Sequence, residues 1–182
     1  GLLTIMMTWP VAPRLSTHLV GNGDDLWVHY WNGWWAERVL QQGGTPYHTD
    51  LLFHPVGVSL RYHNFGWVNI ALWLGLEPIV GGVAAYNLAC LIHIPLCGLA
   101  MFLLARDLTG SGGAAFVAGL IYAFWPYRML DLHHPNMIST EGFPVLVLLL
   151  MRIVRGKSPF RDVILAGLLV GLIGYMRWQL LI

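Results

Sequence analysis

Long apolar stretches separated by short polar connectors occupy the second half of the chain. They cover about residues 83–105, 113–125, 138–154 and 163–182. Since a helix needs about 20 mainly apolar residues to cross a bilayer, the spacing predicts one crossing for each stretch. We therefore expect an all-α, polytopic transmembrane helical bundle, with four transmembrane helices and short connectors over residues 83–182.

The first part of the chain shows a different pattern. Residues 2–7 are apolar and look like the end of a membrane helix, whereas residues 14–82 hold no apolar run long enough for a clear further crossing. We expect residues 14–82 to form a long first extracytoplasmic loop. Because the sequence opens and closes inside apolar runs, we expect residues 1–182 to be a fragment of a larger transmembrane domain.

Three segments can be distinguished within this loop. Residues 24–42 mix several tryptophans with charged side chains, which is typical of a helix that lies along the membrane interface. Residues 43–65 carry Gly and Pro turn signals and predict an ordered but irregular loop. Residues 66–76 are apolar but too short to cross a bilayer, and Glu77-Pro78 is expected to end this interfacial or dipping helix.

Composition agrees with a membrane protein and argues against two other classes. Hydrophobic residues make up 57% of the chain and charged residues 10%, and the mean hydropathy is +0.61. A soluble domain carries about a quarter charged residues, so the composition argues strongly against a soluble globule. The net charge is +1 with no basic cluster, which argues against a nucleic-acid partner. We expect a multi-pass protein of the cell (inner) membrane, with membrane lipid as its surroundings.

The distribution of basic residues predicts the orientation of the bundle. Cytoplasmic loops are enriched in Lys and Arg. Two of the short connectors carry most of the basic residues of the second half: Arg106, Arg152, Arg155, Lys157 and Arg161. These connectors are therefore expected in the cytoplasm, which places the long first loop and the connector around residues 126–136 together on the outer face.

Small and polar residues indicate where the helices meet. Three pairs have the spacing that lets two helix backbones approach closely: Ala114 and Ala118, Ala115 and Gly119, and Gly167 and Gly171. Asn87, Cys90, His93 and Cys97 fall on one helical stripe, which predicts a contact face between helices. The two cysteines are too far apart on one helix for a disulfide, so we expect both to be packing residues.

The most suggestive polar site in the first loop is the pair Asp24-Asp25, which follows the Gly-rich turn at residues 21–23. Adjacent carboxylates can act as a general base for an acceptor hydroxyl, or as oxygen ligands for Mg²⁺ or Mn²⁺. The alternative is that an aspartate caps the helix that follows and complements its dipole. The spacing by itself favours the cap.

The second outer loop is unusually polar. Asp131 and His134 are three residues apart, so one helical turn would bring a carboxylate and an imidazole together for metal binding or proton transfer. The alternative is a solvated interfacial loop. The predicted topology favours a site, because it places this loop on the same face as Asp24-Asp25. Glu141 and Arg177, within the last two apolar stretches, are further candidates because ionisable groups inside a membrane are costly.

The order of these features resembles the GT-C superfamily of polytopic membrane glycosyltransferases. The similarity covers most of the chain and is carried by Gly23-Asp24-Asp25, Pro46, His54-Pro55-Val56-Gly57, Ala85-Tyr86-Asn87, Leu104-Ala105-Arg106, Tyr122 to Tyr127, His134-Pro135-Asn136 and Arg152. The resemblance implies transfer of a sugar from a polyprenyl-phosphate-linked donor to an acceptor at the extracytoplasmic face. It implies a catalytic aspartate at Asp24 or Asp25, and a metal-binding group at Asp131. His133, however, stands where a second carboxylate would be expected.

A different class of function is a non-enzymatic subunit of a larger membrane complex, with other membrane subunits as partners. Such a subunit could be structural or could hold a cofactor, for example a haem ligated by His93 on its apolar helix. A lone histidine is more often a packing residue than a ligand. The contacts of the His93 ring distinguish the two cases.

Overall fold

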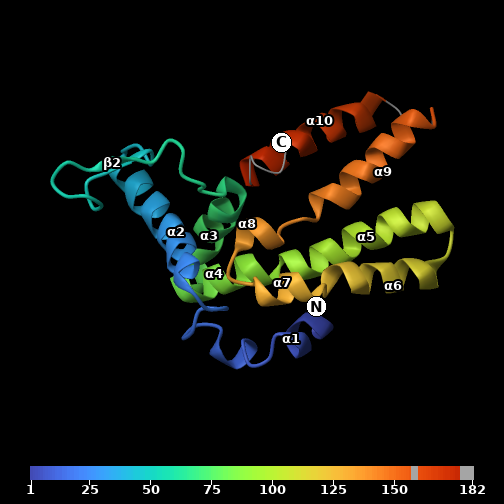
Figure 1. Cartoon of the computed structure of the whole chain (residues 1–182), viewed down its shortest axis with the longest axis horizontal. Helices are drawn as coiled ribbons and strands as arrows, with labels where there is room; N and C mark the ends of the chain where they lie inside the picture. Colours follow the sequence, from blue (N-terminus) through green and yellow to red (C-terminus); the bar gives the residue numbers. More distant parts are fainter. Residues whose placement is uncertain (157–159, 177–182) are drawn as a thin grey trace.

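The computed structural model describes residues 1–156 and 160–176, and this part of the chain is mostly helical (Figure 1). The all-α class is thereby confirmed. The helices are α1 (Leu2–Met7), the 3-10 turn η1 (Ala12–Arg14), α2 (Asp24–Gln42), α3 (Trp67–Val80), α4 (Gly82–Leu91), α5 (His93–Thr109), α6 (Gly112–Ala123), α7 (Pro126–Leu130), α8 (Pro135–Ile138), α9 (Gly142–Val154) and α10 (Phe160–Met176). The strands are β1 (His48–Thr49) and β2 (Val58–Ser59).

Two helical stretches among the described residues are long and apolar enough to cross a membrane: Gly82–Thr109, with 28 residues, and Pro135–Val154, with 20. The first joins α4 to α5 through Ile92. Pro95 has no N–H to donate to the carbonyl of Leu91, which accounts for the irregularity there. The four expected crossings are therefore found only in part.

The other two expected crossings are shorter or incompletely described. α6 has 12 residues, and at about 1.5 Å per residue it covers about 18 Å of a hydrocarbon core that is about 30 Å thick. α10 covers 17 residues as far as Met176. The rest of the predicted segment 163–182, including Arg177, lies outside the described residues, as does Lys157.

The first loop contains the predicted helices and one small sheet. α2 has the bounds expected from the tryptophan-rich pattern, and Gly43 ends it in the left-handed conformation. The expected irregular loop holds the antiparallel pair β1–β2, with His48 opposite Ser59. The expectation that Glu77-Pro78 ends the next helix is wrong, because Pro78 lies inside α3. Its position in the last turn removes few helical hydrogen bonds, and the N–H of Gly81 still reaches the carbonyl of Glu77.

Helices α5 and α6 form the closest contact of the bundle, side by side in Figure 1. A Cβ added to Gly119 would lie 2.7 Å from the carbonyl oxygen of Gly98, so the two backbones touch. Ala115 is fully buried on the same face. The pair Ala115 and Gly119 therefore marks a helix contact, as expected. The corresponding contact at Gly167 and Gly171 is not found among the described residues, because a Cβ at either position would meet none of their atoms within 4 Å.

The polar stripe along α4 and α5 is a contact face, as its spacing predicts. Asn87, Cys90 and Cys97 are fully buried, and both cysteines are free. The Asn87 amide accepts a hydrogen bond from the N–H of Val20 at 2.8 Å and donates to the carbonyls of Leu15 and His18 at 2.7 and 2.8 Å. The buried Asn87 side chain therefore holds the segment before α2 against α4 through these hydrogen bonds.

Charged groups link the two connectors that the basic pattern grouped together. Arg155 Nη1 lies 2.9 Å from Asp107 Oδ2, and Arg152 Nη2 lies 3.7 Å from Asp107 Oδ1. Asp107 lies near the end of α5 and both arginines lie at the end of α9, so these helix ends are neighbours (Figure 1). The start of α2 and helices α7 and α8 lie at the opposite end of the bundle.

Candidate functional site

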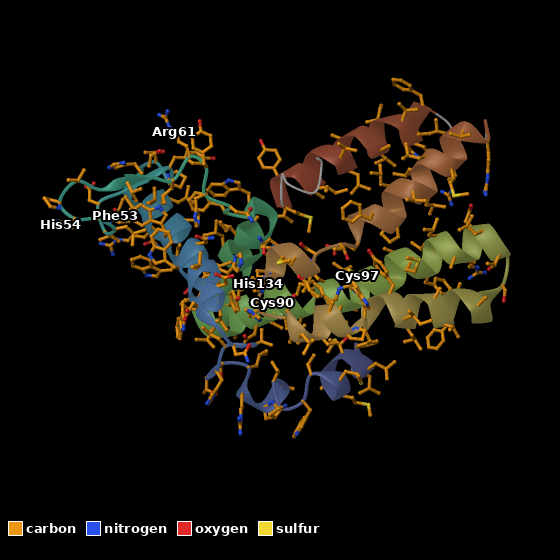
Figure 2. The ribbon with its side chains drawn as sticks, viewed as in Figure 1. Phe53, His54, Arg61, Cys90, Cys97 and His134 are labelled. Atoms are coloured by element: carbon orange, nitrogen blue, oxygen red, sulfur yellow. The ribbon has the colours of Figure 1, made fainter. Side chains whose placement is uncertain are left out.

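The first turn of α2 meets the beginning of α8, 109 residues further along the chain. His134 precedes α8, and Figure 2 labels it near the centre of the molecule. Its Nε2 lies 3.0 Å from Oδ2 of Asp25, so an Nε2–H donates to the carboxylate. The imidazole side chain is 15% exposed, whereas the Asp25 side chain is 70% exposed. The contact brings together one residue from each of the two loops that the sequence predicts to lie on the outer face. It leaves most of the carboxylate accessible.

Asp131 and His133 lie beside His134, and we call Asp25, Asp131, His133 and His134 the polar cluster. The Asp131 Oδ1 atom lies 3.5 Å from His134 Nδ1, which is the pairing expected from their three-residue spacing. Asp131, His133 and His134 each offer a donor atom, and the three atoms lie within 4.8 Å of one another. The rings of His133 and His134 have centroids 4.0 Å apart. The loop between α7 and α8 therefore presents one carboxylate and two imidazoles at one point.

A glycine allows the first loop to reach this cluster. Gly21 has φ of +93°, and a Cβ built on it would lie 2.3 Å from the Cβ of His133. A side chain at this position would be strained by the backbone conformation and would also collide with the histidine. The backbone before α2 therefore lies directly against the second loop.

The two adjacent aspartates have different environments. Gly23 occupies the N-cap position of α2 and no side chain caps the helix, so the interpretation of an aspartate as the cap is wrong. Both aspartates lie in the first turn, where a negative charge is stabilised by the helix dipole. Among the described residues, Asp24 makes no side-chain hydrogen bond or ion pair. Asp25 is therefore the carboxylate that the structure places in the cluster.

His29 is a member of the site that the sequence did not single out. It lies one turn after Asp25 on α2, and its ring packs edge-on against His134 with centroids 5.5 Å apart. Burial is the main cause that lowers its pKa, to about 4, so the ring is neutral at pH 7. The four-residue spacing from Asp25 was the signal that could have identified it. His133 was noted in the sequence only as a departure from the resemblance.

The charges of the remaining groups follow from their surroundings. The hydrogen bond from His134 is the largest cause that lowers the pKa of Asp25, so this group is a carboxylate at neutral pH. Burial lowers the pKa of His133, which favours the neutral imidazole. The site thus combines the carboxylate of Asp25 with the imidazole nitrogens of His29 and His133, whose pKa values are lowered. Such a set can accept a proton from a hydroxyl or bind a metal cation.

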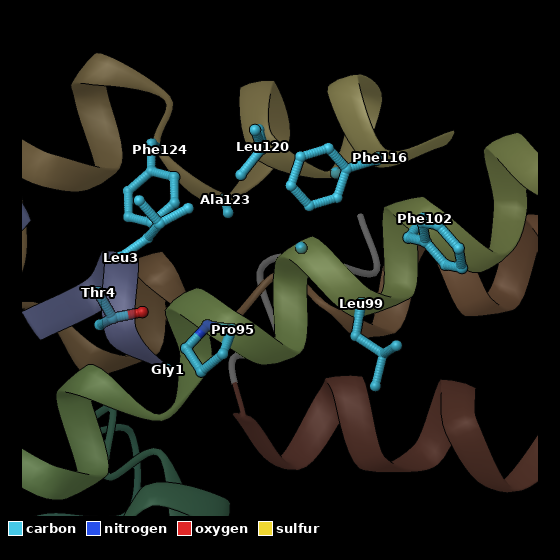
Figure 3. A pocket seen from close by; sticks show the side chains of 12 residues that line it. Gly1, Leu3, Thr4, Pro95, Leu99, Phe102, Phe116, Leu120, Ala123 and Phe124 are labelled. Atoms are coloured by element: carbon cyan, nitrogen blue, oxygen red, sulfur yellow. The ribbon is translucent and has the colours of Figure 1, made fainter. Parts of the chain in front are cut away.

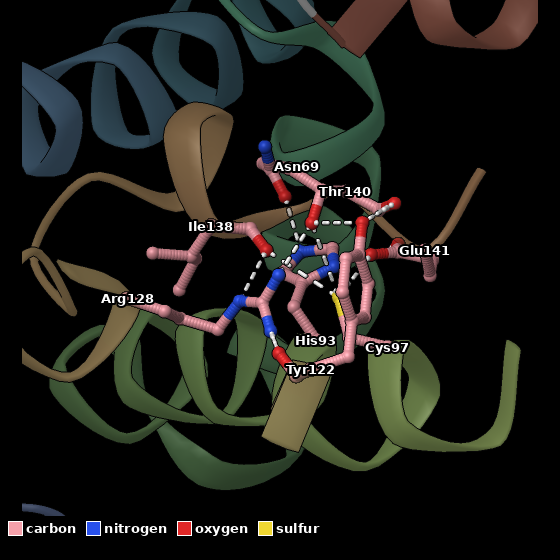
Figure 4. A network of polar contacts seen from close by, with 8 residues as sticks. All are labelled: Asn69, His93, Cys97, Tyr122, Arg128, Ile138, Thr140 and Glu141. Atoms are coloured by element: carbon pink, nitrogen blue, oxygen red, sulfur yellow. Dashed lines mark hydrogen bonds and ion pairs between the residues drawn. The ribbon is translucent and has the colours of Figure 1, made fainter. Parts of the chain in front are cut away.

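A buried arginine holds the second loop in place (Figure 4). Arg128 is 3% exposed. Its guanidinium donates to the carbonyls of Tyr122 and Ala123 before the loop, and to the Ile138 carbonyl and the Thr140 hydroxyl after it. Because these acceptors lie on both sides of residues 131–134, the arginine fixes the two ends of the loop that carries the cluster.

A second polar group lies inside the bundle, also in Figure 4. His93 Nδ1 contacts Glu141 Oε1 at 2.8 Å, and its Nε2 contacts Asn69 Oδ1 at 2.7 Å. Glu141 is the N-cap residue of α9, so the contacts join α3, α5 and α9. Both ring nitrogens of His93 are occupied, which argues against haem ligation by this residue. The buried histidine is a packing residue that also satisfies a carboxylate.

Two grooves differ in their relation to the cluster. An apolar groove of about 270 Å³ lies between α1, α5 and α6 and is lined by residues that include Leu3, Phe102 and Phe116 (Figure 3). None of its lining residues belongs to the polar cluster. A second groove, of about 460 Å³, is lined by residues that include Gly23 and Trp27, on either side of Asp24 and Asp25 along the chain. None of the residues that line this groove is Asp25, Asp131, His133 or His134, so it borders the turn before α2 and not the cluster itself.

We find no significant match when the chain is compared with protein-family models, with curated proteins or with solved structures. The chemistry of the site is therefore the basis for a functional proposal. The Mg²⁺ or Mn²⁺ expected from the sequence can be tested against it. Mg²⁺ and Mn²⁺ prefer carboxylate, carbonyl and water oxygens, whereas two of the three clustered donors are imidazoles. The donor set does not fit these ions well.

Proposed function

We propose that this chain is part of a multi-pass membrane glycosyltransferase. The enzyme moves a sugar from a polyprenyl-phosphate-linked donor to an acceptor hydroxyl at the extracytoplasmic face. The observation that carries the proposal is the hydrogen bond between Asp25 and His134. It joins the two outer loops into one site, as the resemblance to GT-C glycosyltransferases requires. Asp25 is the proposed catalytic base, and Asp131 and His134 approach it from the second loop.

The arrangement of charges in the bundle supports this placement. Two stretches are long and apolar enough to cross a membrane, and the arginines paired with Asp107 lie at the end opposite to the cluster. By the positive-inside rule the arginine-rich end faces the cytoplasm, so the cluster faces outward. A donor with a polyprenyl chain keeps its hydrocarbon in the bilayer and its phosphate and sugar at the surface. Polar groups are then needed at the end of the bundle, where the cluster lies.

The chemical step follows from the accessible carboxylate. The acceptor hydroxyl oxygen attacks the anomeric carbon of the donor sugar, and a new glycosidic C–O bond forms. The bond between that carbon and the phosphate oxygen breaks, and the polyprenyl phosphate leaves with the bonding electrons. The hydroxyl proton passes to the Asp25 carboxylate, which His134 holds in position through its Nε2–H.

The test is to replace Asp25 with Asn in the full-length protein and to measure sugar transfer in membrane vesicles supplied with polyprenyl-phosphate-linked hexoses. Asn keeps the size of the side chain but is not a base. Loss of a general base lowers the rate by about 10² to 10⁴. Asp24→Asn is the matched comparison and should lower the rate less, because Asp24 makes no contact with His134.

Folded yield in detergent is measured for both variants so that misfolding is recognised. A folded Asp25→Asn variant that transfers sugar at the wild-type rate would refute the assignment of the base. If the wild-type protein transfers no sugar from any donor of the series, the non-enzymatic subunit of a larger membrane complex becomes the better interpretation.

A further inference from the structure

We infer that Asp131, His133 and His134 form a binding site for a transition-metal cation that prefers imidazole, with Zn²⁺ as the best fit. The inference does not depend on the proposed transfer reaction, because it concerns metal binding alone. It also departs from the Mg²⁺ or Mn²⁺ that the sequence led us to expect.

The first argument is the geometry of the donors. Zn²⁺ binds imidazole nitrogen and carboxylate oxygen at about 2.0–2.2 Å in a tetrahedral arrangement, which places neighbouring donors roughly 3.3 Å apart. The observed distance between Asp131 Oδ1 and His134 Nδ1 is 3.5 Å, and the donor atoms of all three residues lie within 4.8 Å of one another. Side-chain rotation that shortens the longer of these distances would close the set around one ion.

The second argument is that two buried nitrogens make no hydrogen bond within the described residues, although Asp131 lies 3.5 Å from one of them. Within residues 1–156 and 160–176, the Nδ1 atoms of His133 and His134 are buried and have no hydrogen-bond partner. The whole His133 residue is 8% exposed. A buried polar atom without a partner costs about 1–3 kcal/mol, so native structures rarely retain one. A cation shared by these nitrogens and the neighbouring carboxylate removes that cost.

The third argument is the role of Asp25. When Nε2 of the neutral His134 ring carries the proton and donates it to Asp25, the lone pair is on Nδ1. This Nδ1 faces Asp131. Metal-binding histidines almost always donate their other ring N–H to a carboxylate or carbonyl, which fixes the tautomer and the ring orientation. Asp25 therefore prepares His134 for a metal at the cluster.

The donor types select the metal. Imidazole suits Zn²⁺, Cu²⁺, Fe²⁺ and Ni²⁺, whereas Mg²⁺ keeps oxygen ligands in octahedral geometry. Three protein donors with one tetrahedral position open is the usual arrangement of a catalytic zinc site, whereas structural sites use four. Asp131 and His134 are 22% and 15% exposed, so a small ligand can reach the open position.

The experiment uses the purified full-length protein in detergent, freed of metal with a chelator and then titrated with Zn²⁺ alone. We expect one equivalent to bind, and we expect millimolar Mg²⁺ not to displace it. Asp131→Asn and His133→Ala should each weaken binding at least tenfold. Asp25→Asn should weaken it about 10–100-fold, because it removes the partner that orients His134.

His48→Ala is the matched control. His48 also contacts a carboxylate, Asp50, at 3.0 Å, but the pair is exposed and has no third donor among the described residues. Its Zn²⁺ affinity should equal that of the wild type. If His133→Ala does not fold, the partly exposed Asp131→Asn decides the question. Zn²⁺ binding that is absent, that survives Asp131→Asn, or that Mg²⁺ displaces at similar concentration would overturn the inference.

Discussion

The buried guanidinium of Arg128 offers the most quantitative test of how the second loop is held. Replacement by Met keeps the apolar stem and removes every donor. Two acceptors then lose a partner at the end of α6, the carbonyls of Tyr122 and Ala123. The Tyr122 carbonyl has no helical donor to replace it, because the residue four positions on is Pro126.

The magnitude follows from these acceptors. A buried acceptor without a partner costs about 1–3 kcal/mol, so two cost about 2–6 kcal/mol. The substitution also removes a buried charge, so the folded state no longer bears the cost of desolvating that charge. The expected loss of stability therefore lies in the lower half of this range. We therefore predict that Arg128→Met lowers the free energy of unfolding by about 2–4 kcal/mol. Arg128→Lys should lie between this variant and the wild type, because one ammonium group cannot reach acceptors on both sides of the loop.

The assay is equilibrium unfolding by denaturant in detergent micelles, followed by far-ultraviolet circular dichroism. Arg61→Met is the control, since Arg61 is exposed on the loop before α3 (Figure 2). This control should change the free energy by no more than about 0.5 kcal/mol. The reasoning fails if the Arg128 variant is no less stable than the Arg61 variant.

Three further predictions concern packing, pH and orientation. Gly119→Ala should separate α5 from α6 and lower stability in the same unfolding assay. Gly167→Ala meets no atom of the described residues within 4 Å, so it should be neutral or stabilising by up to about 1 kcal/mol. Equal effects of the two substitutions would contradict the contact at Gly119. Burial lowers the pKa of His63, so the folded state binds fewer protons and stability should fall as pH drops below about 6.5. His63→Gln should reduce that slope, and an unchanged slope would exclude His63 as its source. In sealed cells, cysteine at the exposed Tyr62 should react with an impermeant reagent and cysteine at Gly112 should not; the reverse result would invert the orientation.

Periodicity predicted the helices better than it predicted their ends. The tryptophan-rich segment gave the bounds of α2 because Gly residues lie at both ends and the polar pattern stops there. The end of α3 was misplaced because Pro78 is tolerated in a last turn, where few intrahelical bonds are lost. Small-residue spacing identified the contact at Gly119, but the same spacing at Gly167 meets no neighbour in the part of the chain that the structure describes, since spacing does not tell which face of a helix meets a neighbour.

Several residues of the candidate site could be predicted from the sequence, but not all of the contacts between them. Charge distribution placed Asp25 and His134 on one face, and the three-residue spacing paired His134 with Asp131. Which aspartate of the adjacent pair takes part depends on the direction in which α2 starts. That direction is set by the contact between Gly21 and His133, which joins loops more than a hundred residues apart. No local sequence pattern encodes such a contact.

The ion pair at the arginine-rich end has a consequence for biosynthesis. Asp107 is made with the hairpin of α5 and α6, and 48 residues separate it from Arg155. Contacts that are close in sequence form early because closing a short loop costs little entropy, and a growing chain forms its earlier elements first. Asp107 can therefore pair with Arg155 only after α9 has been synthesised and has folded back to the same end of the bundle. If synthesis stopped before Arg152, the Asp107 carboxylate would have neither arginine beside it. This unpaired carboxylate would distinguish the incomplete chain from the finished protein.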